Sequence, residues 1–304
     1  MSGLFNIKPK LKNYLHLHLL VLIAGFTAIL GKEISISAIP LVWFRMSMAA
    51  ILMLLFILLK GVNLKIDGKS ILKLSTAGVI IALHWITFFA AIDAANVSIA
   101  LAMFSTGAFF ASIIEPIFYK RKVIGYEIIF GILVIIGVCI ITQGELRYIL
   151  GIVLGISSAF FSSLFAVLNG VFLKKHSATV ISFYEFLSGV LFISLFIICF
   201  EGGFSLEFLN ITTRDFSLLF ILASICTAYA FIASVHVMKL ISPYTVVLTY
   251  NLEPVYGIVL AMILYPESEK MSTYFYYGAT IIIATVVLNG VLKNRHAFKR
   301  KQLQ

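Results

Sequence analysis

The chain has 304 residues, of which 61% are hydrophobic and only 12% are charged, and its mean hydropathy is +1.07. This composition excludes an ordinary soluble domain and indicates a polytopic membrane protein. The net charge is +10, but the cations stand in short runs between apolar segments, as in the loops of membrane proteins. This arrangement disfavours nucleic acid as a partner.

Ten apolar runs are long enough to cross a bilayer, for which about 20 residues are needed. No loop between them could hold a soluble domain, so we expect the protein to act within the membrane. In chain order the predicted transmembrane helices are Tyr14–Lys32, Ala38–Leu59, Ile71–Ile92, Ser98–Tyr119, Ile124–Thr142, Tyr148–Lys174, Thr179–Phe200, Asp215–Met238, Ser242–Tyr265 and Tyr274–Leu292.

The distribution of Lys and Arg predicts the orientation, because short loops rich in these residues stay in the cytoplasm. If ten helices alternate across the membrane, eighteen such residues lie on one side and four on the other. The four are Lys32, Arg147, Arg214 and Lys270. We therefore expect both termini in the cytoplasm, with residues 1–13 and 293–304 as basic tails.

A weak internal repeat relates the two halves. A shift of 147 residues places Thr106-Gly107 on Glu253-Pro254, and a shift of 140 residues places Arg45 on Glu185. Five helices per repeat is an odd number, so the two halves must enter the membrane from opposite sides. The predicted fold is all-α, with ten transmembrane helices arranged as two inverted five-helix repeats over residues 14–142 and 148–292.

Glu253 is a carboxylate inside an apolar run, where an ionised group costs at least about 2.5 kcal/mol. The adjacent Pro254 lacks a backbone N–H and frees polar backbone at the same depth, so we expect a helix break there. Gly107 is its counterpart in the first half and could likewise bend or thin its helix. We expect Glu253 to line a central cavity and to serve proton coupling or to bind a substrate ammonium group. Tyr250 and Asn251 would add a phenol and an amide. The alternative is a carboxylate at a helix kink that is tied to the backbone or to Asn251.

Arg45 and Glu185 carry opposite charges at matching places of the second and seventh predicted helices. Arg45 would lie nearer the outer face, where it could attract a substrate carboxylate or close an outer gate, and Glu185 would act at an inner gate. The alternative is that each is a structural charge, paired or reaching toward the interface.

His84 and Trp85 lie in the middle of the third predicted helix. A histidine there could relay protons and an indole could stack on a substrate, although a hydrogen-bonded histidine and a packing tryptophan are the commoner arrangement. The sequence contains no H-E-x-x-H, G-x-S-x-G or P-loop motif, and its three cysteines show no metal-ligand spacing. We therefore expect no catalytic residue, metal site or cofactor.

Three segments carry a family resemblance: Trp43-Phe44-Arg45, Leu252–Tyr256 and Leu264–Glu267. Together with ten helices in two halves, they resemble the drug/metabolite transporter superfamily, in particular proteins with paired EamA-type domains. The resemblance implies secondary transport, usually export of amino acids or other small metabolites from the bacterial cytoplasm, through a cavity between the halves. The chain departs from the pattern at Gly107, where members often have proline, and at Tyr119–Lys122, where a Gly-Glu pair is common.

The resulting hypothesis is a secondary transporter in the bacterial inner membrane that exports small polar metabolites, with amino-acid-like solutes favoured. It would work by alternating access, with proton coupling as a further hypothesis. The expected partners are the substrate and the lipid bilayer, and a homodimer is compatible with the sequence. The alternatives are an uncoupled facilitator with a broad drug-like range, a lipid-linked sugar flippase or a membrane-embedded enzyme.

Overall fold

The computed structural model describes residues 9–120, 122, 124–231, 233, 237, 249, 250 and 252–302, and the regular elements among them are helical. In chain order they are α1 (Pro9–Glu33), α2 (Ala38–Lys60), α3 (Gly68–Ala94), α4 (Val97–Phe104), α5 (Gly107–Tyr119), α6 (Gly125–Gly144), η1 (Leu146–Tyr148), α7 (Ile149–Phe172), α8 (Ala178–Phe200), α9 (Leu206–Leu209), α10 (Thr213–Ala223), η2 (Ser224–Tyr229), α13 (Glu253–Leu264) and α14 (Thr273–Gln302). The predicted all-α class is confirmed.

In this part of the chain, seven helical segments are long and apolar enough to span a membrane. They are Lys12–Glu33, Ala38–Lys60, Gly68–Ala94, Val97–Tyr119, Gly125–Gly144, Leu146–Phe172 and Ala178–Phe200. They match the first seven predicted runs. Two shorter apolar segments, Glu253–Leu264 and Thr273–Asn289, belong to the last two runs. The eighth and ninth runs lie partly outside the described residues, so the count of ten spans stays a prediction.

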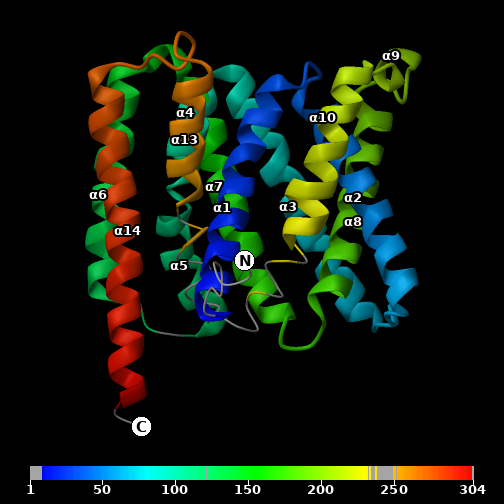
Figure 1. Ribbon diagram of the computed structural model, residues 1–304, viewed down its shortest axis with the longest axis horizontal. Helices are drawn as coiled ribbons and strands as arrows, with labels where there is room; N and C mark the ends of the chain where they lie inside the picture. Colours follow the sequence, from blue (N-terminus) through cyan, green and yellow to red (C-terminus); the bar gives the residue numbers. More distant parts are fainter. Residues whose placement is uncertain are drawn as a thin grey trace, which may run out of the picture.

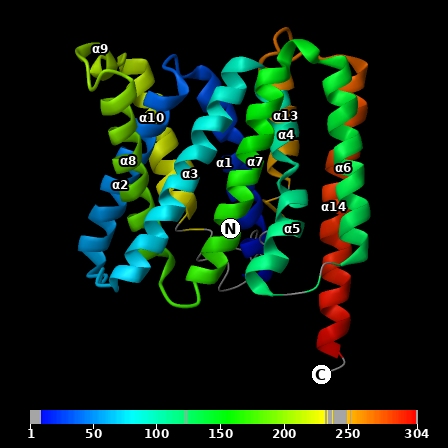
Figure 2. The ribbon, with the colours of Figure 1, turned by 180° about the vertical axis from the view of Figure 1, so that it is seen from behind.

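Consecutive long helices alternate in direction, and the two halves have opposite orientations (Figures 1 and 2). The helix α1 and its counterpart α7 each open one half of the chain, yet they begin at opposite ends of the bundle. The packing follows the same relation. The helix α3 packs on α7 and α8, just as its counterpart α10 packs on α1 and α2, while α6 packs on its own counterpart α14.

The α6–α14 contact brings two backbones together through glycine. A Cβ atom on Gly278 would lie 2.5 Å from the carbonyl oxygen of Gly137, so any larger side chain would force the helices apart. Small residues at such crossings are the usual means of close helix packing in membranes, where van der Waals contact replaces the hydrophobic driving force.

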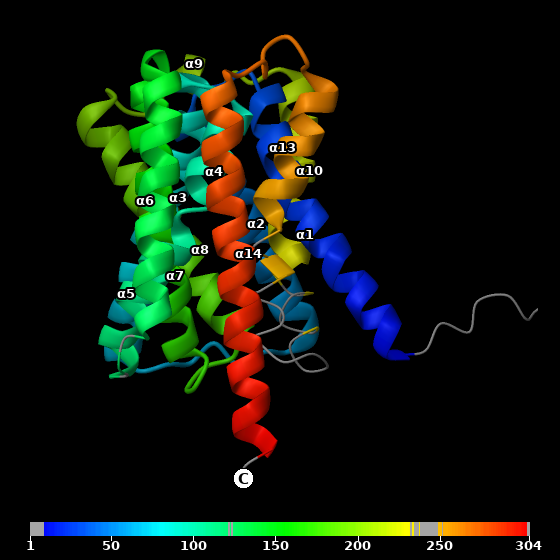
Figure 3. The ribbon, with the colours of Figure 1, turned by 90° about the vertical axis from the view of Figure 1, so that its left-hand side faces the viewer.

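The two ends of the bundle differ in charge. At one end, which we call the acidic end, α1, α3, α6, α8 and α13 terminate (Figure 3). At the other, the basic end, α2, α5, α7 and α14 terminate. The acidic end carries Glu33, Glu145, Asp215 and Glu269. The basic end carries Lys60, Lys65, Lys69 and Lys175.

Candidate functional site

The first half contains an interrupted helix at mid-membrane depth. The span predicted over Ser98–Tyr119 is present as one apolar segment, Val97–Tyr119, within which α4 ends at Phe104 and α5 begins at Gly107. At the break the Thr106 N–H donates to the carbonyl of Met103 at 3.0 Å, a tighter turn than that of an α-helix. Ser163 of α7 donates to the carbonyl of Gly107 at 2.7 Å, so the backbone freed by the break is satisfied by a neighbouring helix.

The second half has an interruption at the matching place. The helix α13 begins at Glu253, after a turn in which the Leu252 N–H donates to the carbonyl of Thr249 at 3.0 Å. Pro254 lies in the first turn of α13, where its missing N–H would have no helical partner in any case. The proline therefore starts a half-helix and does not lie in a helix interior. Glu253 stands at the positive end of that half-helix, which favours a carboxylate.

Arg45 of α2 is buried, with 3% of its surface exposed. Its Nε–H donates to Oγ1 of Thr227 at 2.9 Å, and its Cζ atom lies 4.1 Å from the ring centre of Trp85. Among the described residues, its Nη1 atom has no hydrogen-bond partner. The guanidinium is thus held by one hydrogen bond and one cation–π contact and keeps donors available for a ligand.

Thr227 lies in the π-helical turn η2 that follows α10. Its hydroxyl donates to the carbonyl of Leu222 at 2.8 Å, five residues earlier, and accepts from Arg45. A π-helical turn often marks a functional position because it turns a side chain away from the regular helical face. The sequence carries no signal for this role, since a lone threonine in an apolar run is typical of helix packing.

Arg45 and Glu253 belong to opposite halves and lie within electrostatic range of each other. The two charged groups attract each other electrostatically, and Glu253 is half-buried. Beside them α1 approaches closely, because a Cβ atom on Gly25 would lie 3.1 Å from the carbonyl oxygen of Glu253. Tyr250 is helical and packs against an apolar cluster that includes Leu17 of α1. The predicted site residue Asn251 lies outside the described residues.

His84 and Trp85 face different neighbours. The Nδ1 atom of His84 lies 2.9 Å from the hydroxyl of Ser158 and its ring stacks on Phe104 at 5.4 Å, so this histidine is hydrogen-bonded in the core. Trp85 instead contacts Arg45, and its ring also lies 5.8 Å from that of Phe186. Of this pair, Trp85 belongs to the Arg45 and Glu253 cluster.

Glu185 of α8 is fully buried and does not join that cluster. Its Oε2 atom accepts from Nδ2 of Asn169 on α7 at 3.5 Å. The structure therefore places the predicted site residues at two positions: a central one with Arg45, Trp85 and Glu253, and a second one with Glu185. Asn169 is a neighbour that the sequence did not associate with Glu185.

A model of the EamA-like transporter family matches residues 11–143 and 149–291. The chain belongs to the EamA-like transporter family. The family resemblance seen in the sequence is thereby confirmed, and the two matched segments are the two repeats of an integral membrane transporter of the drug/metabolite type. Members of this family are transporters. In the described part of the chain, no group of three or more His, Cys, Asp or Glu residues is placed to hold a metal ion.

Solved structures share the fold of this EamA-like transporter. One of them, described only as "Crystal structure of protein", aligns with a TM-score of 0.63 and 13% sequence identity, over 93% of this chain and 98% of its own chain. It is one of 27 solved chains that match. At this identity the likeness concerns the fold alone. No curated protein matches the chain.

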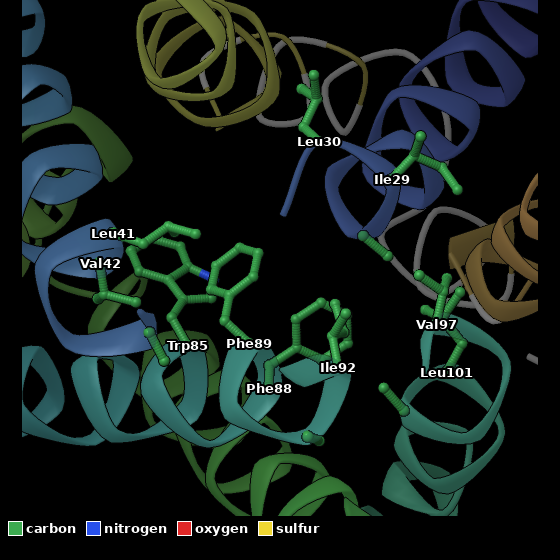
Figure 4. Close-up of a cluster of buried hydrophobic side chains, with 14 of the residues drawn as sticks. Ile29, Leu30, Leu41, Val42, Trp85, Phe88, Phe89, Ile92, Val97 and Leu101 are labelled. Carbon is green, nitrogen blue, oxygen red and sulfur yellow. The ribbon is translucent and has the colours of Figure 1, made fainter. Parts of the chain in front are cut away.

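Between the Arg45 and Glu253 cluster and the acidic end, the EamA-like transporter is filled by an apolar layer from α1, α2, α3 and α4 (Figure 4). Its members include Ile29, Leu30, Leu41, Val42, Trp85, Phe88, Phe89, Ile92, Val97 and Leu101. In this layer Trp85 of α3 lies beside Leu41 and Val42 of α2, while Ile92 lies on the side of Val97 (Figure 4). Trp85 is the member of the layer that also faces Arg45.

Beyond the apolar layer, polar contacts join the halves at the acidic end. Arg214 pairs with Glu33, the last residue of α1, whose carboxylate also accepts from the hydroxyl of Tyr265 at 2.6 Å. The hydrogen bond from Tyr265 is the main reason that the pKa of Glu33 lies below its ordinary value. Burial opposes the charged form of Asp215, but hydrogen bonds from Ser35 outweigh it and leave the pKa of Asp215 below its ordinary value.

Proposed function

We propose that this EamA-like transporter is a secondary active transporter that exports small zwitterionic metabolites, amino acids above all, by alternating access between two inverted repeats of five helices. The observation that carries the proposal is a pair of opposite charges from the two halves, Arg45 of α2 and Glu253 at the start of α13, which attract each other electrostatically. Each half also has an interrupted helix. Interrupted helices at matching places of two repeats are typical of substrate sites in transporters.

The chemistry of this pair fits a zwitterion. The unpartnered Nη1 of Arg45 supplies donors for a carboxylate, and a guanidinium binds carboxylates with good geometry. Glu253 supplies the acceptor for an ammonium group. The Trp85 ring, which already faces the guanidinium, adds an apolar surface for the rest of the solute.

We further propose that the basic end faces the cytoplasm of a bacterial cell, with both termini on that side of the inner membrane. The excess of Lys and Arg at this end supports the orientation. The apolar layer and the ion pairs would then close the outer side. Export would begin from a state of this kind, because the solute must first bind from inside.

Solute counterflow with purified protein in liposomes tests the substrate class. Labelled zwitterionic amino acids should exchange, while matched amines without the carboxylate and matched acids without the ammonium group should not. Arg45→Gln and Glu253→Gln should each lower exchange by about tenfold or more, the equivalent of about 1.4 kcal/mol. Glu201→Gln, at an exposed position of the acidic end, is the matched control and should exchange like the wild type.

Three results would redirect the proposal. Equal exchange of zwitterions, amines and acids would remove the role of the charge pair and favour a facilitator with a broad range. Exchange that never responds to an imposed pH gradient would show uncoupled transport. A chain that exchanges no solute of the panel but moves a lipid-linked sugar would be a flippase.

A further inference from the structure

Glu185 lies in one of the tightest places of the bundle. Glu185 is 0% exposed. Its backbone carbonyl oxygen lies so close to α3 that a Cβ atom on Gly78 would collide with it. The site is built from both halves, since α3 belongs to the first half and α7 and α8 to the second. A charge here is far from water and must be neutralised locally.

The only hydrogen bond to this carboxyl group from a described residue comes from the amide of Asn169. Two buried oxygen atoms of the pair, Oε1 of Glu185 and Oδ1 of Asn169, have no hydrogen-bond partner among the described residues. Both atoms are acceptors when Glu185 is ionised, so neither can satisfy the other. An ionised Glu185 would thus leave two buried acceptors unsatisfied and a charge uncompensated.

A single proton on Glu185 removes both problems. A carboxylic acid and a primary amide are complementary, because the acid donates to the amide carbonyl while the amide nitrogen donates to the acid carbonyl. The ionised form allows only the second of these bonds. We propose that the Glu185 and Asn169 pair is a proton-binding site, separate from the charge pair at Arg45 and Glu253, and that it couples transport to the proton gradient.

Among the described residues, no charged group of the surrounding helices pairs with Glu185, and Lys60, Lys69 and Lys73 are exposed at the basic end. On α2, Arg45 donates to Thr227 and faces Trp85. On α3, His84 is held by Ser158 of α7. Beyond the end of α7, at the basic end, Lys175 pairs with Asp67 at 2.5 Å. Protonation therefore replaces a missing counter-ion at Glu185.

The coupling role rests on the proposed transport function. The pair spans α7 and α8 and packs on α3 of the other half, so a movement of one half against the other changes the space around Glu185. Asn169 is half-buried and lies three residues before the end of α7 at the basic end, which gives the proton a way to that side. The proton and the solute then bind at different positions and can be exchanged in opposite directions.

Infrared spectroscopy of the purified protein in liposomes tests proton binding without any substrate. The carbonyl stretch of a protonated carboxyl group should appear and disappear as the pH is varied between about 5 and about 9. The spectra are compared in the Glu253→Gln background, so that the Glu253 carboxyl group does not contribute. Glu253→Gln should keep a pH-dependent band, and the double variant with Glu185→Gln should lose it. Asn169→Leu should keep the band but shift it to higher frequency, because the amide hydrogen bonds are removed. This variant retains Glu185 and so tests the site even if Glu185→Gln fails to fold.

A band that persists in the double variant of Glu253→Gln and Glu185→Gln, or that does not shift in Asn169→Leu, would overturn the proton site. A band that vanishes when choline chloride is replaced by sodium chloride would assign the site to Na⁺ and overturn the choice of proton. Amino acid counterflow then separates coupling from transport. Glu185→Gln should retain exchange and lose accumulation driven by a pH gradient, whereas loss of exchange in the wild type would contradict the proposed function and leave the infrared result standing.

Discussion

The acidic and basic ends of the bundle both connect the halves, but with different chemistry. At the acidic end, Glu145, Asp215 and Glu269 are each about 1% exposed, and each accepts from a backbone N–H that belongs to the other half. At the basic end, Asp67 is 48% exposed, accepts from the N–H of Ser70 in its own helix and pairs with Lys175.

The carboxylates of the acidic end are buried away from water, whereas the ion pair of the basic end is exposed to it. A buried carboxylate that accepts from N–H groups at a helix start is a strong, charge-assisted interaction, and breaking it leaves buried donors unpaired. An exposed ion pair is screened by salt and contributes little. We infer that the acidic end resists opening more strongly than the basic end, which agrees with a state closed on the outer side.

The largest effect is expected for Glu269→Ala. Its carboxylate accepts from the N–H groups of Val97 and Ser98 at 3.2 and 2.9 Å and pairs with Lys32 at 2.8 Å. Its removal should lower the free energy of unfolding by about 3 kcal/mol, measured by reversible unfolding in mixed detergent micelles. Glu267→Ala, in the same loop but exposed, is the control and should leave stability unchanged. Equal stability of the two variants would contradict the role of Glu269.

A smaller loss is expected for Glu145→Ala, at the other repeat. Glu145 accepts from the N–H of Ser272 at 2.7 Å, before the start of α14, and its ion pair with Arg147 is long and exposed at 3.5 Å. With one buried hydrogen bond in place of two, the free energy of unfolding should fall by about 1.5 kcal/mol in the same measurement. A loss larger than that of Glu269→Ala would reverse the order that the hydrogen bonds imply.

Hydrophobicity predicts the first seven spans because a bilayer requires long apolar segments with internal hydrogen bonds. The sequence also marks Gly107 and Pro254 as positions where a helix breaks, and α5 begins at Gly107 and α13 at Glu253. The sequence does not predict how the freed backbone is satisfied, since the carbonyl of Gly107 accepts from Ser163 of another helix.

Rare charges make part of the site visible in the sequence. Arg45, Glu185 and Glu253 stand out in apolar runs, and in the structure Arg45 and Glu253 lie within electrostatic range of each other. Their neutral partners Thr227 and Asn169 carry no such signal, because hydroxyl and amide groups in apolar helices usually serve packing. The acidic loop residues give only a charge asymmetry in the sequence, since their binding to helix starts depends on how the halves meet.

At the basic end the expected effect on stability is small. Asp67→Asn removes the ion pair with Lys175, but an exposed asparagine can still accept from Ser70 as a helix cap. The hydrogen bond from Lys175 is the main reason that the pKa of Asp67 lies below its ordinary value. Asp67→Asn should therefore destabilise less than Glu145→Ala, and the difference from wild type should disappear in high salt. A loss of stability that does not depend on salt would show that the ion pair at the basic end is shielded from water like the carboxylates at the acidic end.

The smallest effect is expected in acid, through Glu33. Because the hydroxyl of Tyr265 holds the pKa of Glu33 below its ordinary value near 4.5, this carboxylate stabilises the acidic end fully above that value and loses its contribution as the pH falls through the lowered one. Tyr265→Phe keeps the ring over Lys32 but removes the hydrogen bond, so the pKa of Glu33 should rise toward its ordinary value.

The free energy of unfolding, followed from neutral pH into acid, should then begin to fall at a higher pH in Tyr265→Phe than in the wild type. Glu33→Gln should remove this contribution. The fall in the free energy of unfolding that remains in acid is then due to Asp215, whose pKa is also held below its ordinary value. Coincident pH profiles of Tyr265→Phe and the wild type would mean that the contact between Tyr265 and Glu33 does not help to hold the acidic end closed. The acidic end would then be held closed by the buried carboxylates of Glu145, Asp215 and Glu269 alone.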